Sequence, residues 1–387
     1  MIRSGARFGG TLVDIPHGMK LGWNGDAMSA LESLMTEQGH PPVFASHLDR
    51  LACRDLIKTG SHSFFSASLL LPEELREAAY ALYAFCRLSD DAVDVENGNG
   101  LAILRLKERL DGVYGGEPEP LPSDRCLADV VRRYAIPRYV FDLLLEGFEW
   151  DVSGRTYKTL DDVEAYGERV AGSVGAMMAA LMGVRDPAMV ERACDLGVAM
   201  QLTNIARDIG EDAQNGRLYL PLDWFVAAGL DAGDWLKDPQ FLPQIGDMTS
   251  LLLSRAESLY RRADQAIARL PALVRPAIFA ARLLYAEIGR VIHDQGYNSI
   301  HERANTSPAR KAWLVGAAMQ RAARPMPKAA LTIQDGLNRP LVAAICLEPP
   351  PPRAANKRPG GVKDDLNWVL DLFSDLEVRD RTGRRSS

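Results

Sequence analysis

The sequence is poor in the residues that build redox and zinc sites. Its five cysteines are scattered without a Cys-x-x-Cys pair, and none of its six histidines belongs to a His-Glu-x-x-His motif. An odd number of dispersed cysteines is typical of reduced thiols in a cytosolic protein and not of a disulfide framework. The missing His-Glu-x-x-His pattern argues against a zinc hydrolase.

Long apolar runs, basic excess and nucleotide-binding motifs are also missing. The longest nearly apolar run, VGAMMAALMGV at 174–184, is about half as long as a helix that spans a bilayer. No N-terminal segment resembles a secretion signal, so we expect a cytosolic protein that is at most peripheral to a membrane. The net charge of −6 argues against nucleic acid as a partner. Neither a P-loop nor a glycine fingerprint after a predicted strand occurs.

What the sequence does contain is helical periodicity, which predicts an all-α fold. Apolar residues recur three and four apart, and β-branched alternation is scarce. We predict a disordered extension over 1–45, one helical domain over 46–325, and a Pro-rich linker with a short amphipathic tail helix over 326–387. Within the domain, helices are predicted over 48–58, 71–94, 101–113, 126–147, 160–184, 187–213, 248–269 and 274–296.

Two predicted helices carry aspartates four residues apart with an arginine nearby. QLTNIARDIGEDAQNGRLYLP at 201–221 contains Asp208 and Asp212, and FCRLSDDAVD at 85–94 contains Asp90 and Asp94. Residues at this spacing share one face of a helix. Read singly, the first pair is a solvated face on which Arg207 joins an intrahelical ion pair. Two such faces together suit opposite walls of one cavity, because unpaired charges are costly to bury.

Carboxylates without histidine or thiolate neighbours indicate a hard-cation site. Mg²⁺ is typically held by one or two carboxylates and by substrate phosphate oxygens, and arginine binds the phosphate oxygens that remain. The small residues of AYGERVAGSVGAMMAALMGV at 165–184 give two readings. Because glycine costs a helix interior about 1 kcal/mol, Gly172 and Gly175 indicate either close helix packing or clearance for a long hydrocarbon chain.

Four motifs together resemble the squalene/phytoene synthase family over about residues 50–315. They are SHSFFSASLLLPEELREAAYALYAFCRLSDDAVD, YGERVAGSVGAMM, QLTNIARDIGEDAQNGRLYLP and GYNSIHER, in that order. The resemblance implies the isoprenoid synthase fold, a single-domain helical bundle around a central cavity. His62 departs from the pattern, because the family often has lysine or arginine there.

The resemblance also implies the site residues. Mg²⁺ or Mn²⁺ is expected on Asp90, Asp94, Asn204, Asp208 and Asp212. Substrate diphosphate is expected on Ser61, Ser63, Arg87, Arg207, Tyr285, Arg303 and Lys311. The four aspartates, Arg87 and Tyr285 form the expected catalytic set. Arg217 and Tyr219 match the family as well, with a structural role as the alternative.

The implied reaction joins two prenyl diphosphates head to head through a cyclopropylcarbinyl diphosphate. With geranylgeranyl diphosphate the product is phytoene, the first committed step of carotenoid biosynthesis. A C30 synthase that makes squalene or dehydrosqualene from farnesyl diphosphate is the alternative. No NADPH is expected, since no nucleotide fingerprint occurs. A non-catalytic helical scaffold is disfavoured because all four aspartates are present.

One further segment suggests contact with a membrane. PARKAWLVGAAMQRAARPMPK at 308–328 combines basic residues with an apolar stripe that includes Trp313 and Leu314. Such a helix lies at an anionic interface, or it is an edge helix of the bundle with a basic outer face. The oligomeric state is left open by the sequence.

Overall fold

The computed structural model describes residues 7–8, 11–12, 43–95, 101–325 and 331–347. The chain divides into two units, Met1–Phe44 and Ala45–Ser387. In the first unit, strands β1 (Arg7–Phe8) and β2 (Thr11–Leu12) pair antiparallel. The remainder of the predicted extension up to residue 42 and the predicted tail helix lie outside the described residues.

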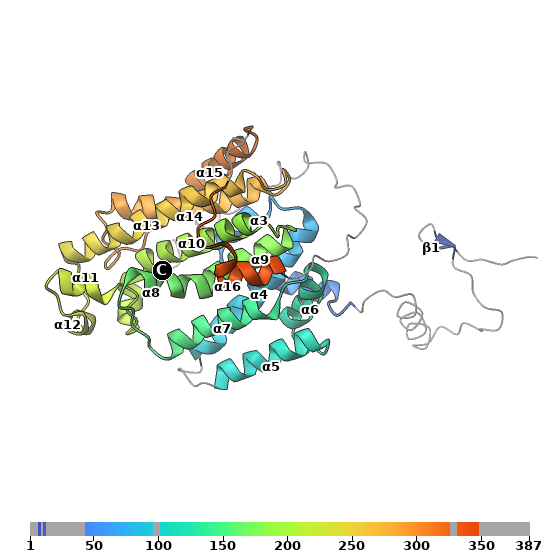
Figure 1. The fold of residues 1–387 in the computed structure, drawn as a ribbon, viewed down its shortest axis with the longest axis horizontal. Coiled ribbons are helices and arrows are strands. Elements are labelled where there is room, and N and C mark those ends of the chain that lie inside the picture. The colour runs from blue at the N-terminus through green and yellow to red at the C-terminus, as the bar shows by residue number, and fades with distance from the viewer. Residues whose placement is uncertain (1–6, 9–10, 13–42, 96–100, 326–330, 348–387) are drawn as a thin grey trace, which may run out of the picture. The chain divides into compact units, whose positions relative to one another are not determined.

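The described part of the second unit is all-α, which confirms the predicted fold class (Figure 1). Its first six helices are α2 (His47–Gly60), α3 (His62–Ser68), α4 (Glu73–Val95), α5 (Leu101–Gly115), α6 (Pro122–Tyr134) and α7 (Arg138–Val152). The central segment comprises α8 (Leu160–Gly167), the π-helical turn η1 (Glu168–Gly172), α9 (Ser173–Leu181) and α10 (Pro187–Gln214). The remaining elements are α11 (Leu222–Ala227), α12 (Ala232–Lys237), α13 (Pro243–Ile267), α14 (Arg275–Asp294), α15 (Pro308–Ala322), the 3₁₀ turn η2 (Gly336–Asn338) and α16 (Pro340–Leu347).

Helix α10 is the centre of the bundle. Its start is fixed by the Asp186 side chain, which accepts a hydrogen bond from the Met189 amide, and by Pro187 in the first turn. It packs against η1, α9, α13, α14 and α16, and Figure 1 places it between α13–α15 on one side and α5–α7 on the other. Because neighbours surround it, α10 buries apolar residues on most of its circumference.

Two predicted helices are interrupted in the structure. The helix predicted over 126–147 breaks between α6 and α7, where Ala135 has a left-handed φ of 46° and Pro137 precedes α7. The residue before a proline is driven away from the helical region, which ends the first helix there. The helix predicted over 160–184 contains η1 between α8 and α9. The short helices α3, α11 and α12 were not predicted.

Residues 331–347 fold onto the helical domain, although the sequence analysis placed them in the linker. Leu341, Val342 and Ile345 of α16 are fully buried, and α16 packs on α7, α9 and α10. Its sequence is apolar on all sides and therefore lacks the periodicity by which the other helices were predicted. No helix among the described residues has the length and apolar character that crossing a membrane requires.

Candidate active site

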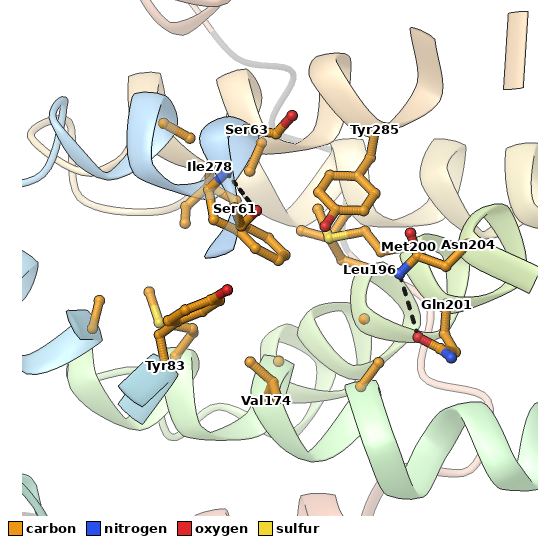
Figure 2. A pocket seen from close by; sticks show the side chains of 18 of the residues that line it. Ser61, Ser63, Tyr83, Val174, Leu196, Met200, Gln201, Asn204, Ile278 and Tyr285 are labelled. Carbon is orange, nitrogen blue, oxygen red and sulfur yellow. Dashed lines mark hydrogen bonds between the residues drawn. The ribbon is translucent and has the colours of Figure 1, made fainter. Parts of the chain in front are cut away.

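A cavity of about 700 Å³ lies among α3, α4, α9, α10 and α14. Figure 2 shows side chains from all five helices directed toward a common space. Apolar residues such as Val174, Leu196 and Ile278 form much of the lining. Predicted site residues that also line it are Ser61, Ser63, Arg87, Asp90, Asn204, Arg207, Tyr285, Arg303 and Lys311. The cavity is thus apolar along its walls and carries polar groups of both signs.

The two serines lie at the start of α3. Ser61 ends α2 and caps α3, and its Oγ accepts a hydrogen bond from the Phe64 amide at 3.4 Å. Ser63 follows in the first turn, so both hydroxyls are beside the amides of a helix N-terminus, where anions are favoured. His62, between them, is exposed and also lines the cavity.

Helix α4 contributes Arg87 and Asp90. Arg87 pairs mainly with Asp91, over 2.7 Å between Nη2 and Oδ1, and more weakly with Asp90 over 3.8 Å. All three side chains are about half exposed. Asp94 lies on the same helix, but its side chain is outside the described residues. Asp91, which is not among the predicted site residues, is thus the closer partner of Arg87.

Asp208 of helix α10 accepts hydrogen bonds from two arginines. Arg207 donates from Nε and Nη2 to its two oxygens at 2.9 and 2.5 Å, and Arg303 donates from Nε to Oδ1 at 2.9 Å. Burial raises the pKa of Asp208, but these contacts outweigh it and hold the pKa below its ordinary value. Glu211 pairs with Arg303 over 3.7 Å.

Asp212 is in the opposite electrostatic situation. Burial, and then the charge of Asp208, raise its pKa to about 7. Asp208 and Asp212 share a helix face but are not among the residues that line the cavity. The local excess of negative charge at Asp212 is what a bound cation would relieve.

Asn204 is a second polar group whose surroundings fit a bound cation. Its Nδ2 donates to Gln201 Oε1 at 3.5 Å, whereas its buried Oδ1 has no hydrogen-bond partner among the described residues. A buried acceptor without a partner is rare and needs an explanation such as an ion. No three Asp, Glu, His or Cys side chains among those described are grouped so that they could hold a metal by themselves. Oxygen donors in smaller groups fit Mg²⁺, which takes further ligands from substrate phosphate and water.

Tyr285 of α14 lines the same cavity, on the side where Asn204 lies. It is buried, packs against Phe64 with ring centroids 4.9 Å apart, and points toward the cavity beside Met200 and Asn204 (Figure 2). Burial raises the pKa of its hydroxyl to about 12. Tyr285 is therefore a neutral hydrogen-bond donor near neutrality.

Asp151 is a carboxylate in the cavity lining that was not among the predicted site residues. Asp151 lies near the end of α7, lines the cavity, and accepts hydrogen bonds from Tyr166 at 2.9 Å and from Tyr219 at 2.7 Å. The three residues belong to different helical or loop segments, 15 and 68 residues from Asp151, so no spacing within one helix relates them. Tyr219 is therefore connected to the cavity through Asp151 and does not line it.

The glycines of the α9–α10 wall are explained by close packing. A Cβ at Gly175 would lie 2.2 Å from the carbonyl oxygen of Ala193, and one at Gly197 would lie 2.1 Å from that of Ala171. Gly172 is crowded by Glu168 and Leu341. Of the two readings of Gly172 and Gly175, the contacts favour helix packing, although Gly175 also lines the cavity.

Comparison with known proteins identifies the family. The squalene/phytoene synthase family model matches residues 57–310. The chain belongs to the squalene/phytoene synthase family. It is 50% identical to phytoene synthase of Rhodobacter capsulatus over 69% of this chain and 80% of that protein. It is 43% identical to phytoene synthase of Cereibacter sphaeroides over 85% of this chain and 94% of that protein.

Solved structures of this family share the fold. A dehydrosqualene synthase is similar with a TM-score of 0.64 and 32% identity, over 70% of this chain and 95% of that one. A squalene synthase from Alicyclobacillus acidocaldarius has a TM-score of 0.58 and 26% identity, over 65% of this chain and 95% of that one. The fold is thus the isoprenoid synthase fold expected from the family resemblance.

Proposed function

We propose that this protein is a phytoene synthase that condenses two molecules of geranylgeranyl diphosphate head to head. The observation that carries the proposal is its 43–50% identity to bacterial phytoene synthases. The site supports it, because an apolar cavity of about 700 Å³ carries Arg87, Arg207 and Arg303 in its lining. Such a cavity suits a substrate with a long hydrocarbon chain and an anionic head.

Divalent metal binding is part of this proposal. Asp90, Asp94, Asn204, Asp208 and Asp212 are the residues that would hold Mg²⁺ or Mn²⁺. The ion would act as a Lewis acid on the departing diphosphate, which is worth several kcal/mol of transition-state stabilisation. The unpartnered Oδ1 of Asn204 and the raised pKa of Asp212 support this assignment.

The cationic side chains bind the diphosphates. Arg207 and Arg303 both donate to Asp208, which fixes their guanidinium groups and leaves other N–H groups for phosphate oxygens. Arg87 and Lys311 add positive charge, and Ser61, Ser63 and Tyr285 donate hydroxyl hydrogen bonds. These contacts neutralise the leaving group as the carbon–oxygen bond breaks.

The apolar side chains of the cavity wall surround the prenyl chains and the carbocations formed from them. One substrate loses diphosphate to give an allylic cation, and the double bond of the second attacks it, forming a cyclopropylcarbinyl diphosphate with loss of a proton. A second loss of diphosphate, rearrangement and loss of another proton give phytoene. Val174, Met178 and Leu196 line the cavity and exclude water, which would otherwise trap the cations.

A C30 synthase acting on farnesyl diphosphate is the second candidate. The similarity to dehydrosqualene and squalene synthase structures at 32% and 26% identity supports it. Purified protein should be incubated with either prenyl diphosphate and Mg²⁺, with and without NADPH, and the lipids separated by chromatography. Phytoene from geranylgeranyl diphosphate without NADPH is the expected result. Preferential turnover of farnesyl diphosphate would replace the proposal by its alternative.

Peripheral membrane contact through α15 completes the proposal, since the hydrocarbon product is insoluble in water. Trp313 is 60% exposed and lies under the Arg310 guanidinium. Arg310 and Arg321 also pair with Glu287 and Asp264 inside the protein, as expected of an edge helix. Flotation with anionic liposomes should therefore fall when Trp313 is replaced by alanine. Flotation that does not change would leave α15 as an edge helix.

A further inference from the structure

Residues 331–347, which we name the C-terminal strap, lie beyond the end of the family match at residue 310. The strap contains η2 and α16 and packs against α7, α9 and α10 (Figure 1). Two sets of polar contacts join it to the segment that forms one wall of the cavity. The strap is therefore an integral part of the helical domain.

The first contact is made by Arg339. Its Nε donates to Glu168 Oε1 at 2.8 Å, its Nη2 donates to Glu168 Oε2, and its Nη1 donates to Asp195 Oδ1 at 2.9 Å. Glu168 is the first residue of η1, and Asp195 belongs to α10. One largely buried guanidinium thus bridges two wall elements. Such a planar fork holds carboxylates in a fixed geometry.

The second contact is made by Glu191 of α10, whose side chain is fully buried. It accepts from the backbone amides of Gln334 at 3.2 Å and Gly336 at 3.4 Å. It also pairs with Arg192, a residue that lines the cavity. Burying ions is costly unless they are fully paired, so the strap amides help to satisfy this buried carboxylate.

The strap packs against η1, which forms part of the cavity wall. A Cβ on Gly172 would lie 2.9 Å from Glu168 Oε2 and 3.5 Å from Leu341 Cδ1. Val170 and Ala171, the preceding residues of η1, line the cavity. A π-helical turn is rare and is frequently found at functional sites. The strap therefore contacts η1 on one side while the cavity lies on the other.

We propose that Arg339 is a positioning residue for the condensation. Through Glu168 and Asp195 it fixes η1 against α10, and so sets where Val170 and Ala171 stand in the wall that contacts the prenyl chain. The identity of that chain rests on the proposed function. Displacing Val170 and Ala171, which are apolar and carry no reacting group, should weaken binding of the chain more than it changes the chemistry.

The test compares three full-length variants: Arg339→Gln, Arg339→Lys and the control Arg261→Gln, whose side chain is 71% exposed in a 3.9 Å ion pair with Glu257. Arg339→Gln is expected to raise KM for geranylgeranyl diphosphate about tenfold while kcat stays within about threefold. With farnesyl diphosphate, whose shorter chain contacts less of the wall, KM should rise less. Arg339→Lys should recover part of the loss, because an ammonium cannot bridge both carboxylates equally well. Arg261→Gln should behave as wild type.

Hydrogen exchange gives a second readout that needs no substrate. In Arg339→Gln, the amides of residues 168–178 should exchange at least about tenfold faster, whereas those of α13 and α14 stay at the wild-type rate. Uniformly faster exchange, or unchanged exchange with unchanged KM, would overturn the positioning role. A wild-type protein that converts neither prenyl diphosphate would overturn the proposed function, and hydrogen exchange would still decide the role of Arg339.

Discussion

Arg303 donates from its Nε to Oδ1 of Asp208 over 2.9 Å, although 95 residues separate the two in the chain. The contact joins the segment after α14 to the face of α10 that carries Asp212. It places a cation from a distant segment beside the aspartates of the second motif. Charge balance at this site thus depends on the tertiary fold and not on α10 alone.

Replacing Asp208 by asparagine should remove most activity. The variant loses a metal-binding carboxylate and leaves Arg207 and Arg303 without their shared anion. Because the metal contributes several kcal/mol, we expect kcat to fall at least about hundredfold. The rate of product formation from geranylgeranyl diphosphate measures this fall in kcat. Asp234→Asn, on the exposed surface, is the control. Full activity of Asp208→Asn would remove Asp208 from the expected catalytic set.

Replacing Asn204 by alanine should weaken metal binding without abolishing activity. Its Oδ1 is buried without a partner among the described residues, and we assign it to the cation. The Mg²⁺ concentration for half-maximal activity should rise about tenfold. Titration of chelator-treated protein with Mg²⁺ measures this, and Gln320→Ala on the exposed face of α15 is the control. An unchanged Mg²⁺ requirement would remove Asn204 from the metal site.

Glu287 should make stability depend on pH. Burial raises its pKa, but hydrogen bonds from Arg290 and Arg310 outweigh it and hold the pKa below the ordinary value. Its stabilisation is therefore full above the unfolded pKa of about 4.3 and is lost as the pH falls through the lower folded pKa. At pH 7, Glu287→Gln should lower the free energy of unfolding by about 1–3 kcal/mol.

Urea unfolding of wild type and Glu287→Gln at several pH values measures this difference, which should shrink below about pH 4. Glu74→Gln is the control, because Glu74 is 69% exposed in its pair with Arg133 and should change stability by less than about 1 kcal/mol. A difference between Glu287→Gln and wild type that is the same at pH 7 and below pH 4 would contradict the prediction.

Two glycines should respond to alanine in opposite directions. At Gly175 the added Cβ would lie 2.2 Å from a backbone oxygen, so α9 and α10 must separate. We expect Gly175→Ala to lower stability by about 2 kcal/mol or more. At Gly316, in α15, nothing lies within 4 Å, and Gly316→Ala should raise stability by about 0.5–1 kcal/mol. Thermal unfolding of both variants checks the pair, and equal shifts would refute the packing argument.

Local spacing made part of this structure predictable. The four-residue spacing of Asp208 and Asp212 and the 3.6 period of α10 lie within one helix, so the sequence predicts their shared face. Asp151, in contrast, meets Tyr166 and Tyr219 only after the bundle is packed. The sequence could not predict the ion-pair partner of Glu211 either, because Arg303 lies in the segment that follows α14. Helix α16 was missed because an all-apolar segment has no amphipathic period.

The α9–α10 contact has a consequence for changing the product of this protein. At Gly175 and Gly197, main chain meets main chain, so exchanging side chains there cannot remodel the wall gradually. Mutational libraries should find new substrate lengths elsewhere, at Met182, Met189 or Ile278, whose side chains also line the cavity. The backbone contact then stays fixed while substitutions at these three side chains change the shape of the cavity.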